Sequence, residues 1–183
     1  EGIFNMKFDV IISNPPYQLS DGGNGKSAKP IYHHFVLQAK KMQPRYLSMI
    51  IPSRWFTGGK GLDDFRNKML NDQSIRKLVD YENFKDVFPG VDLAGGACYF
   101  LWDRDNKGKC EVINQTNDSF ESALRYLNEY ETFIRQNKAI SIVKKIVNQN
   151  KIFLNTRVSS RKPFGLATNY EPTSKGIPCH FIQ

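Results

Sequence analysis

Cysteine is scarce in this sequence and is not arranged for cross-linking. The 183-residue chain has three cysteines, Cys98, Cys110 and Cys179, which are far apart and odd in number. No two of them have the spacing of a metal-ligand pair, so neither a disulfide framework nor a cysteine-ligated metal site is expected. This usage predicts reduced thiols in a cytoplasmic protein.

Long hydrophobic runs are absent, and acidic residues are outnumbered. No apolar run approaches the roughly 18 residues that a membrane-spanning helix needs, so no membrane partner is expected. The chain has 26 Lys and Arg residues against 18 Asp and Glu residues, a net charge of +8 that favours a polyanionic partner. Residues 151–183 contribute +4 of this charge, so half of the excess lies in that short segment.

The most informative stretch lies near the start of the sequence. Residues 8–12, Phe-Asp-Val-Ile-Ile, are rich in branched and aromatic side chains and predict a short buried strand. Asn14, Pro15, Pro16 and Tyr17 follow, and the prolines cannot donate to a sheet ladder, so the strand must end in a turn. Open α/β sheets bind ligands at this end of their strands. The amide and the aromatic ring there can accept hydrogen bonds from an amino group and stack on a flat ring.

This stretch resembles motif IV of the adenine-N6 DNA methyltransferases, and most closely the modification enzymes of bacterial restriction-modification systems. The resemblance implies S-adenosylmethionine as cofactor and double-stranded DNA as substrate. It also implies a restriction endonuclease domain or subunit as partner, and no metal. It makes Asn14, Pro15, Pro16 and Tyr17 the catalytic residues, which act on an adenine that is flipped out of the duplex.

In that family, the Asn14 side-chain oxygen and the Pro15 carbonyl would accept the two hydrogens of the adenine amino group. Tyr17 would stack on the flipped base. Phe88, in a Val-Phe-Pro stretch that matches motif VIII, would stack on its other face, although a core anchor is the alternative for this ring.

Three further residues with ring side chains lie on the following predicted helix. Phe35 matches the aromatic residue of motif V, which with Asn14 would bind the cofactor, and plain core packing is its alternative. His33 and His34 are adjacent and point to different faces of a helix, which is poor geometry for a shared metal ion.

The order of predicted elements matches the second half of a Rossmann-like methyltransferase sheet, an α/β fold of parallel strands with a terminal antiparallel hairpin. Apolar periodicity predicts helices that begin near Pro30 and Leu62, and strands at residues 46–51, 75–81, 97–102 and 111–114. The family's glycine-rich cofactor loop has no counterpart before Phe8. We therefore expect residues 1–118 to be the carboxyl-side half of a catalytic domain, a fragment that is inactive alone.

The remaining residues divide into a connector and a basic segment. Residues 119–150 are predicted as a helical connector with an amphipathic helix at 138–150, and residues 151–183 as the start of a target-recognition region. Arg157, Arg161 and Lys162 are candidate contacts to DNA phosphates, and a solvated basic loop is the alternative.

Two other functions stay open on the sequence alone. The Asn-Pro-Pro-Tyr motif also occurs in enzymes that methylate RNA or protein glutamine. A non-catalytic module that only binds nucleic acid is a third interpretation. The basic tail favours nucleic acid over protein, and the motif VIII aromatic favours DNA.

Overall fold

The structure is a computed structural model that describes residues 7–19, 29–90, 94–116, 118–130 and 132–149. The chain divides into two compact units, Glu1–Ser141 and Ile142–Gln183. The first unit contains the sheet and its covering helices. Of the second unit, only the latter part of one helix, α3 (Asn137–Gln149), is described.

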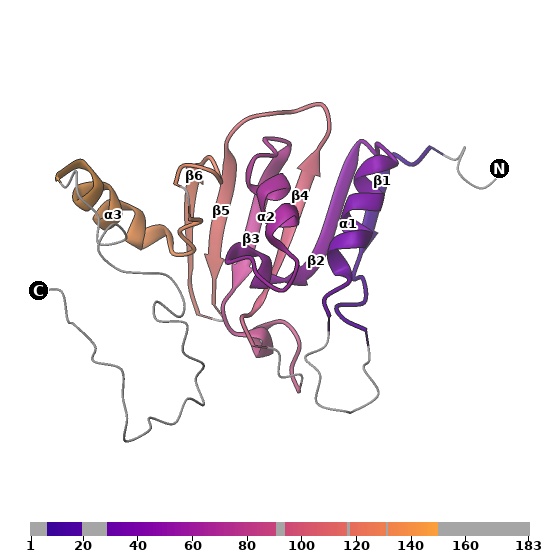
Figure 1. The fold of residues 1–183 in the computed structure, drawn as a ribbon, viewed down its shortest axis with the longest axis horizontal. Coiled ribbons are helices and arrows are strands. Elements are labelled where there is room, and N and C mark those ends of the chain that lie inside the picture. The colour runs from indigo at the N-terminus through magenta and orange to yellow at the C-terminus, as the bar shows by residue number, and fades with distance from the viewer. Residues whose placement is uncertain (1–6, 20–28, 91–93, 117, 131, 150–183) are drawn as a thin grey trace, which may run out of the picture. The chain divides into compact units, whose positions relative to one another are not determined.

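A six-stranded mixed sheet forms the first unit (Figure 1). Its order is β1-β2-β4-β3-β5-β6, and the strands are β1 (Val10–Ser13), β2 (Tyr46–Pro52), β3 (Ile75–Tyr81), β4 (Ala97–Asp103), β5 (Cys110–Gln115) and β6 (Phe120–Arg125). Strands β1, β2, β3 and β5 run parallel, and β4 is inserted antiparallel between β2 and β3. This confirms the predicted α/β class with both parallel and antiparallel strands. We call the ends where the parallel strands start and finish the amino edge and the carboxyl edge.

The hairpin differs from the prediction. Strands β4 and β5 follow one another in the chain, but β3 lies between them in the sheet, so they do not pair. The antiparallel hairpin is β5 with β6, in register from Cys110↔Arg125 to Gln115↔Phe120. The prediction of a wholly helical connector over 119–150 was therefore wrong for residues 120–125. Its helix was right, since α3 covers Asn137–Gln149.

Both long helices of the first unit cover the same face of the sheet (Figure 1). They are α1 (Tyr32–Lys41) and α2 (Asp63–Leu70). Strand β2 and the short helix η1 (Ser53–Phe56) lie between them in the chain, and the short helix η2 (Phe84–Asp86) follows β3. The acidic pair Asp63 and Asp64 begins α2, where the helix dipole favours negative charge. Side chains of these helices and of the facing strand positions form one core.

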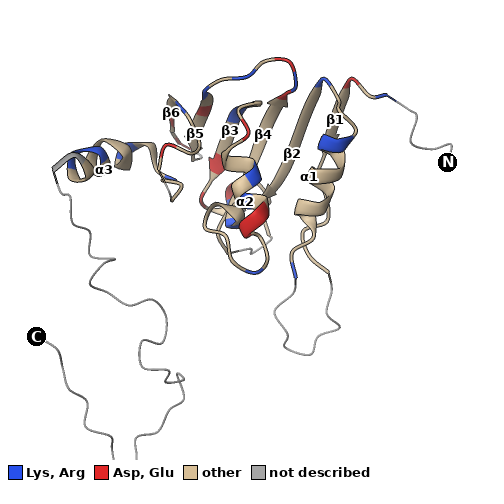
Figure 2. Ribbon diagram, turned by 45° about the horizontal axis from the view of Figure 1, so that its top comes forward, with Lys and Arg blue, Asp and Glu red and all other residues tan. Residues whose placement is uncertain are grey.

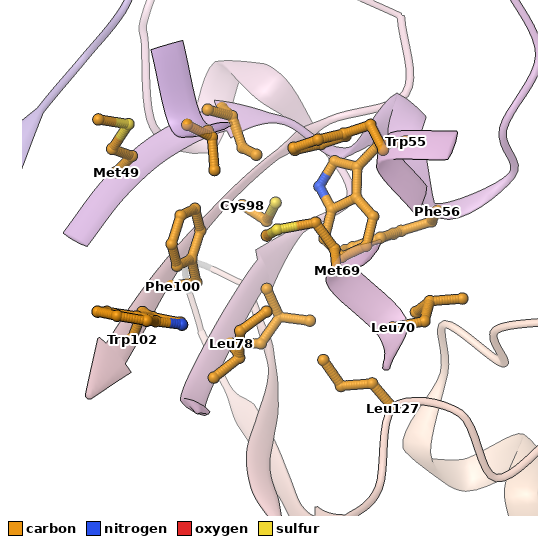
Figure 3. Packing of buried hydrophobic residues seen from close by; sticks show 14 of the residues in the cluster. Met49, Trp55, Phe56, Met69, Leu70, Leu78, Cys98, Phe100, Trp102 and Leu127 are labelled. Atoms are coloured by element: carbon orange, nitrogen blue, oxygen red, sulfur yellow. The ribbon is translucent and has the colours of Figure 1, made fainter. Parts of the chain in front are cut away.

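The core is aromatic and closely packed. Cys98, Phe100 and Trp102 lie along β4, and Cys98 is close to Trp55 and Met69 (Figure 3). Trp55 has no exposed surface, and its ring makes edge contacts with Phe56 and Phe65. Burial of these large rings supplies most of the stabilisation of a unit of this size.

The first strand is less buried than predicted. Val10 is 51% and Ile12 79% exposed, and only Ile11 of this strand packs against the core. The reason is its position, since β1 lies at the end of the strand order and α1 and α2 cover a single face. Residues alternate across a strand, so Val10 and Ile12 face away from those helices.

The amino edge holds a partly buried ion pair. Lys40, near the end of α1, donates to Asp72 at 2.7 Å, and the Trp102 indole N–H donates to the same carboxylate oxygen at 2.8 Å. The Ser74 backbone N–H donates to the other oxygen at 2.9 Å. This cluster ties α1 to the start of β3 and the end of β4.

Candidate active site

The predicted catalytic turn follows β1 at the carboxyl edge. Asn14 and Pro16 are exposed, Pro15 is buried, and Tyr17 is half-buried against the core. The buried Pro15 has no N–H, so its burial leaves no backbone donor in need of an acceptor. The turn thus presents the Asn14 side chain to solvent from a fixed backbone.

The backbone carbonyl of Tyr17 is hydrogen-bonded, but its side-chain hydroxyl is not. Its carbonyl accepts a hydrogen bond from Ile31 N at 3.0 Å, which ties the turn to the start of α1. The hydroxyl is buried and has no hydrogen-bond partner among the described residues. Burial, and next the nearby Cys98 thiol, raise the pKa of Tyr17 to about 12, while Asn14 lowers it slightly. Asn14 is therefore close to the phenol but makes no hydrogen bond of ordinary geometry with it.

Tyr17 belongs to a cluster of three rings. Its ring meets Phe84 edge-on with centroids 6.1 Å apart, and Phe84 lies 5.1 Å from Phe88 at an interplanar angle of 31°. Phe84 is buried and Phe88 is partly exposed. The structure thus brings the two predicted base-stacking residues to one place, with Phe84 between them. We call Tyr17, Phe84 and Phe88 the aromatic cluster.

Sequence reasoning missed Phe84. The available signal was the short segment after β3, where Asn83 caps η2 by accepting the Lys85 N–H. A cap at Asn83 predicts a tight turn, and such a turn holds the backbone of Phe84 in place. Three residues at this edge, Ser53, Asp80 and Arg135, were also missed.

The predicted cofactor residue Phe35 is not part of the core. Its side chain is 44% exposed, while Tyr32, Val36 and Ala39 form the buried face of α1. Core packing, the alternative interpretation of Phe35, is therefore excluded. Phe35 lies in the first turn of α1, the turn that Ile31 ties to Tyr17.

The described residues hold no metal site and no membrane span. Within them, no group of three or more His, Cys, Asp or Glu side chains is placed to bind a metal ion. The His33 and His34 rings lie 3.9 Å apart, so the prediction that they point to different faces of the helix was wrong. Burial, and next the neighbouring His34, lowers the pKa of His33. None of the helices in this part of the chain is long and apolar enough to cross a membrane. The predicted DNA contacts Arg157, Arg161 and Lys162 lie outside the described residues.

Comparison with known proteins identifies the segment that carries this turn. The model of the Eco57I restriction-modification methylase family matches residues 2–88. Residues 2–88 are thus similar to the Eco57I methylase family, and we call them the methylase segment. The methylase segment contains the predicted catalytic turn, Phe35 and the whole aromatic cluster, and it ends at Phe88.

The similarity extends to a curated relative. An uncharacterized adenine-specific methylase from Mycoplasma pneumoniae is 43% identical over 107 residues, which are 57% of this chain and 25% of that protein. The chain therefore spans about a quarter of the length of this relative.

Solved structures of restriction-modification proteins also match. The methyltransferase subunit of a type I restriction-modification system from Streptococcus thermophilus has a TM-score of 0.43 at 12% identity, covering 78% of this chain and 31% of the subunit. A chain from a study of type I restriction-modification complex assembly has the same TM-score of 0.43 at 14% identity, covering 79% and 30%.

Proposed function

We propose that this chain forms the target-base side of an adenine-N6 DNA methyltransferase that uses S-adenosylmethionine. The observation that supports it is the exposed Asn14 beside the aromatic cluster, on a turn inside the methylase segment. Residues 1–118 would belong to the catalytic domain, 119–150 to a connector and 151–183 to the recognition region.

The proposed chemistry needs positioning more than any reactive side chain. The Asn14 carboxamide oxygen and the Pro15 carbonyl would accept the two amino hydrogens of adenine, which orients the nitrogen lone pair away from them. The nitrogen would thereby be oriented for a direct displacement at the methyl group that the cofactor supplies, and one amino proton would leave to solvent. Such a direct displacement gains from orientation and from fixed dipoles at the developing positive charge.

The exposed end of α1 suits the cofactor. Bound there, S-adenosylmethionine would supply the electrophilic methyl group. Phe35 presents an exposed ring in the first turn of α1, next to the turn that carries Asn14, and can pack against a flat heterocycle. Pro15 and Ile31 would keep the two binding elements in fixed relation.

The aromatic cluster would hold the flipped base. Stacking on an aromatic side chain is worth about 1–3 kcal/mol per base, and extruding a base costs a few kcal/mol. One ring roughly offsets the extrusion, and a second ring favours the flipped state. Tyr17 and Phe88 would provide these two rings, with Phe84 supporting both.

DNA is the proposed substrate because of charge and family. Arg157, Arg161 and Lys162 would neutralise phosphates, which makes affinity strongly salt-dependent. Among the described residues, charged positions are spread over several elements (Figure 2). A restriction endonuclease domain or subunit is the proposed partner.

The test is Asn14→Ala in the complete natural protein, with single-turnover methylation and DNA binding measured separately. The amide acts more strongly in the transition state than in the ground state, so its loss should lower turnover about 100- to 1,000-fold and leave binding nearly unchanged. Gln18→Ala, an exposed neighbour beyond the turn, is the matched control and should keep normal turnover.

Assays with three substrates side by side distinguish methylation of DNA from methylation of RNA or protein. Duplex DNA, RNA and a glutamine-containing protein would each be offered with labelled S-adenosylmethionine. Labelled N6-methyladenine in DNA supports the proposal. Transfer only to RNA or protein, or normal turnover by Asn14→Ala, would contradict it.

A further inference from the structure

A buried carboxylate gathers three strand ends at the carboxyl edge. Asp80, near the end of β3, is only 2% exposed. Ser53, the residue after β2, donates its hydroxyl to Asp80 at 2.7 Å. The Ser53 backbone N–H donates to the carbonyl of Gly96, just before β4, at 3.0 Å. The ends of β2 and β3 and the start of β4 therefore meet around one negative charge.

The positive partner comes from a distant part of the chain. Arg135 donates to the two oxygens of Asp80, from Nε at 2.5 Å and from Nη2 at 2.9 Å. Its guanidinium also lies 5.6 Å from the centroid of the Phe56 ring. Arg135 follows β6 and lies outside the methylase segment of residues 2–88. The carboxyl edge thus depends on a residue that the family match does not include.

The backbone of Arg135 is itself fixed. The Asn114 side chain, on β5, donates to the Arg135 carbonyl at 3.0 Å and accepts the Asn137 N–H at 2.9 Å. The Asn137 side chain then donates to the Val112 carbonyl at 2.8 Å. Arg135 therefore reaches the carboxyl edge from a backbone anchored to β5.

A short path leads from this ion pair to the aromatic cluster. Arg135 Nη2 also donates to the Tyr81 carbonyl at 3.3 Å, and Tyr81 precedes Phe84 by three residues. On the other side, the buried Cys98 thiol lies near both Asp80 and Tyr17. The ion pair is thus linked to the cluster through Tyr81 toward Phe84 and through Cys98 toward Tyr17.

Stability alone does not account for such a pair. Replacing a buried ion pair by apolar residues is often neutral or stabilising, because desolvation of the charges offsets their attraction. An arginine that binds a carboxylate with two donors does, however, fix geometry well. We propose that Arg135 is a positioning residue that, through Asp80 and Tyr81, sets the carboxyl edge and the aromatic cluster for base binding. This inference rests on the proposed methyltransferase function.

The experiment compares Arg135→Met with Lys40→Met in the complete natural protein. Lys40→Met is the matched control, because it removes the cation of the ion pair at the opposite edge. Single-turnover methylation is measured with saturating DNA and cofactor, at a temperature where circular dichroism shows each variant folded. A small misplacement of catalytic groups costs up to about 100-fold, so we expect Arg135→Met to lower the rate constant about 10- to 100-fold. Lys40→Met should keep the rate within about twofold of wild type, because its ion pair lies away from the proposed site.

A conservative variant separates positioning from charge. Arg135→Lys keeps the charge but loses the two-donor geometry, so it should restore only part of the rate. If Arg135→Met does not fold, Ser53→Ala replaces it. That variant removes one hydrogen bond from Asp80 and should lower the rate by a smaller factor.

Amide hydrogen exchange gives a readout that does not depend on activity. The Phe88 N–H donates to the Phe84 carbonyl at 3.0 Å, and its exchange reports the order of the cluster. It should become faster in Arg135→Met and not in Lys40→Met. Unchanged exchange and an unchanged rate in Arg135→Met would overturn the inference, as would equal rate losses in both variants. If wild-type protein transfers no methyl group, the proposed function fails, and exchange alone decides whether Arg135 orders the cluster.

Discussion

The two edges of the sheet differ in how their polar groups are hydrogen-bonded. At the amino edge, Lys40, Asp72 and the Trp102 indole N–H bond to one another. At the carboxyl edge, Asn14 is exposed, and the buried Tyr17 hydroxyl has no partner among the described residues. A buried polar group without a partner is costly, so one at a proposed site is a candidate for ligand contact. The comparison supports the proposal that the carboxyl edge binds the target base while the amino edge stabilises the sheet.

The Asp80–Arg135 pair complicates this division. It is a paired, buried cluster like that of the amino edge, but it lies at the binding edge. Its partners come from the strand ends that lead into the proposed site. Substitutions at matched positions of the two edges can therefore separate stability from function.

Gly96→Ala at the carboxyl edge should have the largest effect. Gly96 has a φ of +78°, and an added Cβ would lie 2.0 Å from the Tyr81 carbonyl oxygen and 2.8 Å from Arg135 Nη2. The strained backbone costs about 1–2 kcal/mol and overpacking a further 1–3 kcal/mol, so we expect a loss of about 3 kcal/mol or more in the free energy of unfolding. Urea denaturation measures it. Turnover should fall as well, because the strand ends must separate.

The matched control is Gly108→Ala, in the turn at the amino edge. Its φ is +152°, but an added Cβ would meet only the flexible end of the Arg76 side chain, at 2.4 Å. That side chain can move, so the cost should be about 1–2 kcal/mol with turnover unchanged. Equal losses for the two glycines would remove the distinction between the edges.

Asp72→Ala should destabilise the sheet without slowing the reaction. It leaves the Lys40 ammonium and the Trp102 N–H without their acceptor. Breaking a buried ion pair costs about 3–5 kcal/mol, and the lower end applies here because part of the Asp72 side chain is exposed. Thermal and urea unfolding measure the loss, and methylation is assayed well below the unfolding temperature. A rate reduced as strongly as in Asn14→Ala would contradict the assignment of this edge to stability.

The Asp72 carboxylate should also make the free energy of unfolding depend on pH in the acid range. Burial alone raises the pKa of Asp72, but the Lys40 charge and hydrogen bonds from Lys40, Ser74 and Trp102 outweigh it, so the folded-state pKa is lowered. A lowered carboxylate pKa adds stability above the unfolded-state value of about 3.9, and this is lost as pH falls through the folded-state value. Urea midpoints between pH 7 and pH 2 should therefore fall on the acid side.

In Asp72→Asn, this acid limb should be flatter than in wild type. Asp118→Asn, at an exposed position before β6, serves as the control and should leave the acid limb as in wild type. A parallel acid limb in Asp72→Asn would show that other carboxylates cause the loss.

Local sequence signals predicted the positions of the helices and strands better than their burial and their pairing partners. The apolar run that ends at Pro52 and the alternation over 75–81 placed β2 and β3 within a residue of their observed ends, and the prolines after β1 predicted the turn that carries Asn14. Exposure of β1 was missed because it depends on what covers the strand, which no local pattern encodes. Strand β6 was missed because its alternation becomes meaningful only through pairing with β5.

The polar contacts of the site were the least predictable part. Asp80 and Arg135 are 55 residues apart and meet only through the order of the sheet strands. Phe84 packs between Tyr17 and Phe88, two rings that come from opposite ends of the methylase segment. Motifs identified the residues that would touch the base, and only the structure shows what supports them.

Tyr17→Phe should have the smallest effect and tests whether the ring or the hydroxyl matters. The hydroxyl is buried without a partner, and its pKa of about 12 keeps it neutral at any working pH. Removing an unpaired buried polar group is close to neutral or stabilising, so the free energy of unfolding should rise or stay within about 1 kcal/mol of wild type. Turnover should also stay close to normal, since stacking needs only the ring, whereas Tyr17→Ala should weaken base binding and turnover together. Tyr126→Phe, which removes an exposed hydroxyl after β6, provides the control for the chemical change. A large loss of turnover in Tyr17→Phe alone would show that the hydroxyl finds its partner in the bound substrate, and that the open polar group at the carboxyl edge is a binding group in its own right.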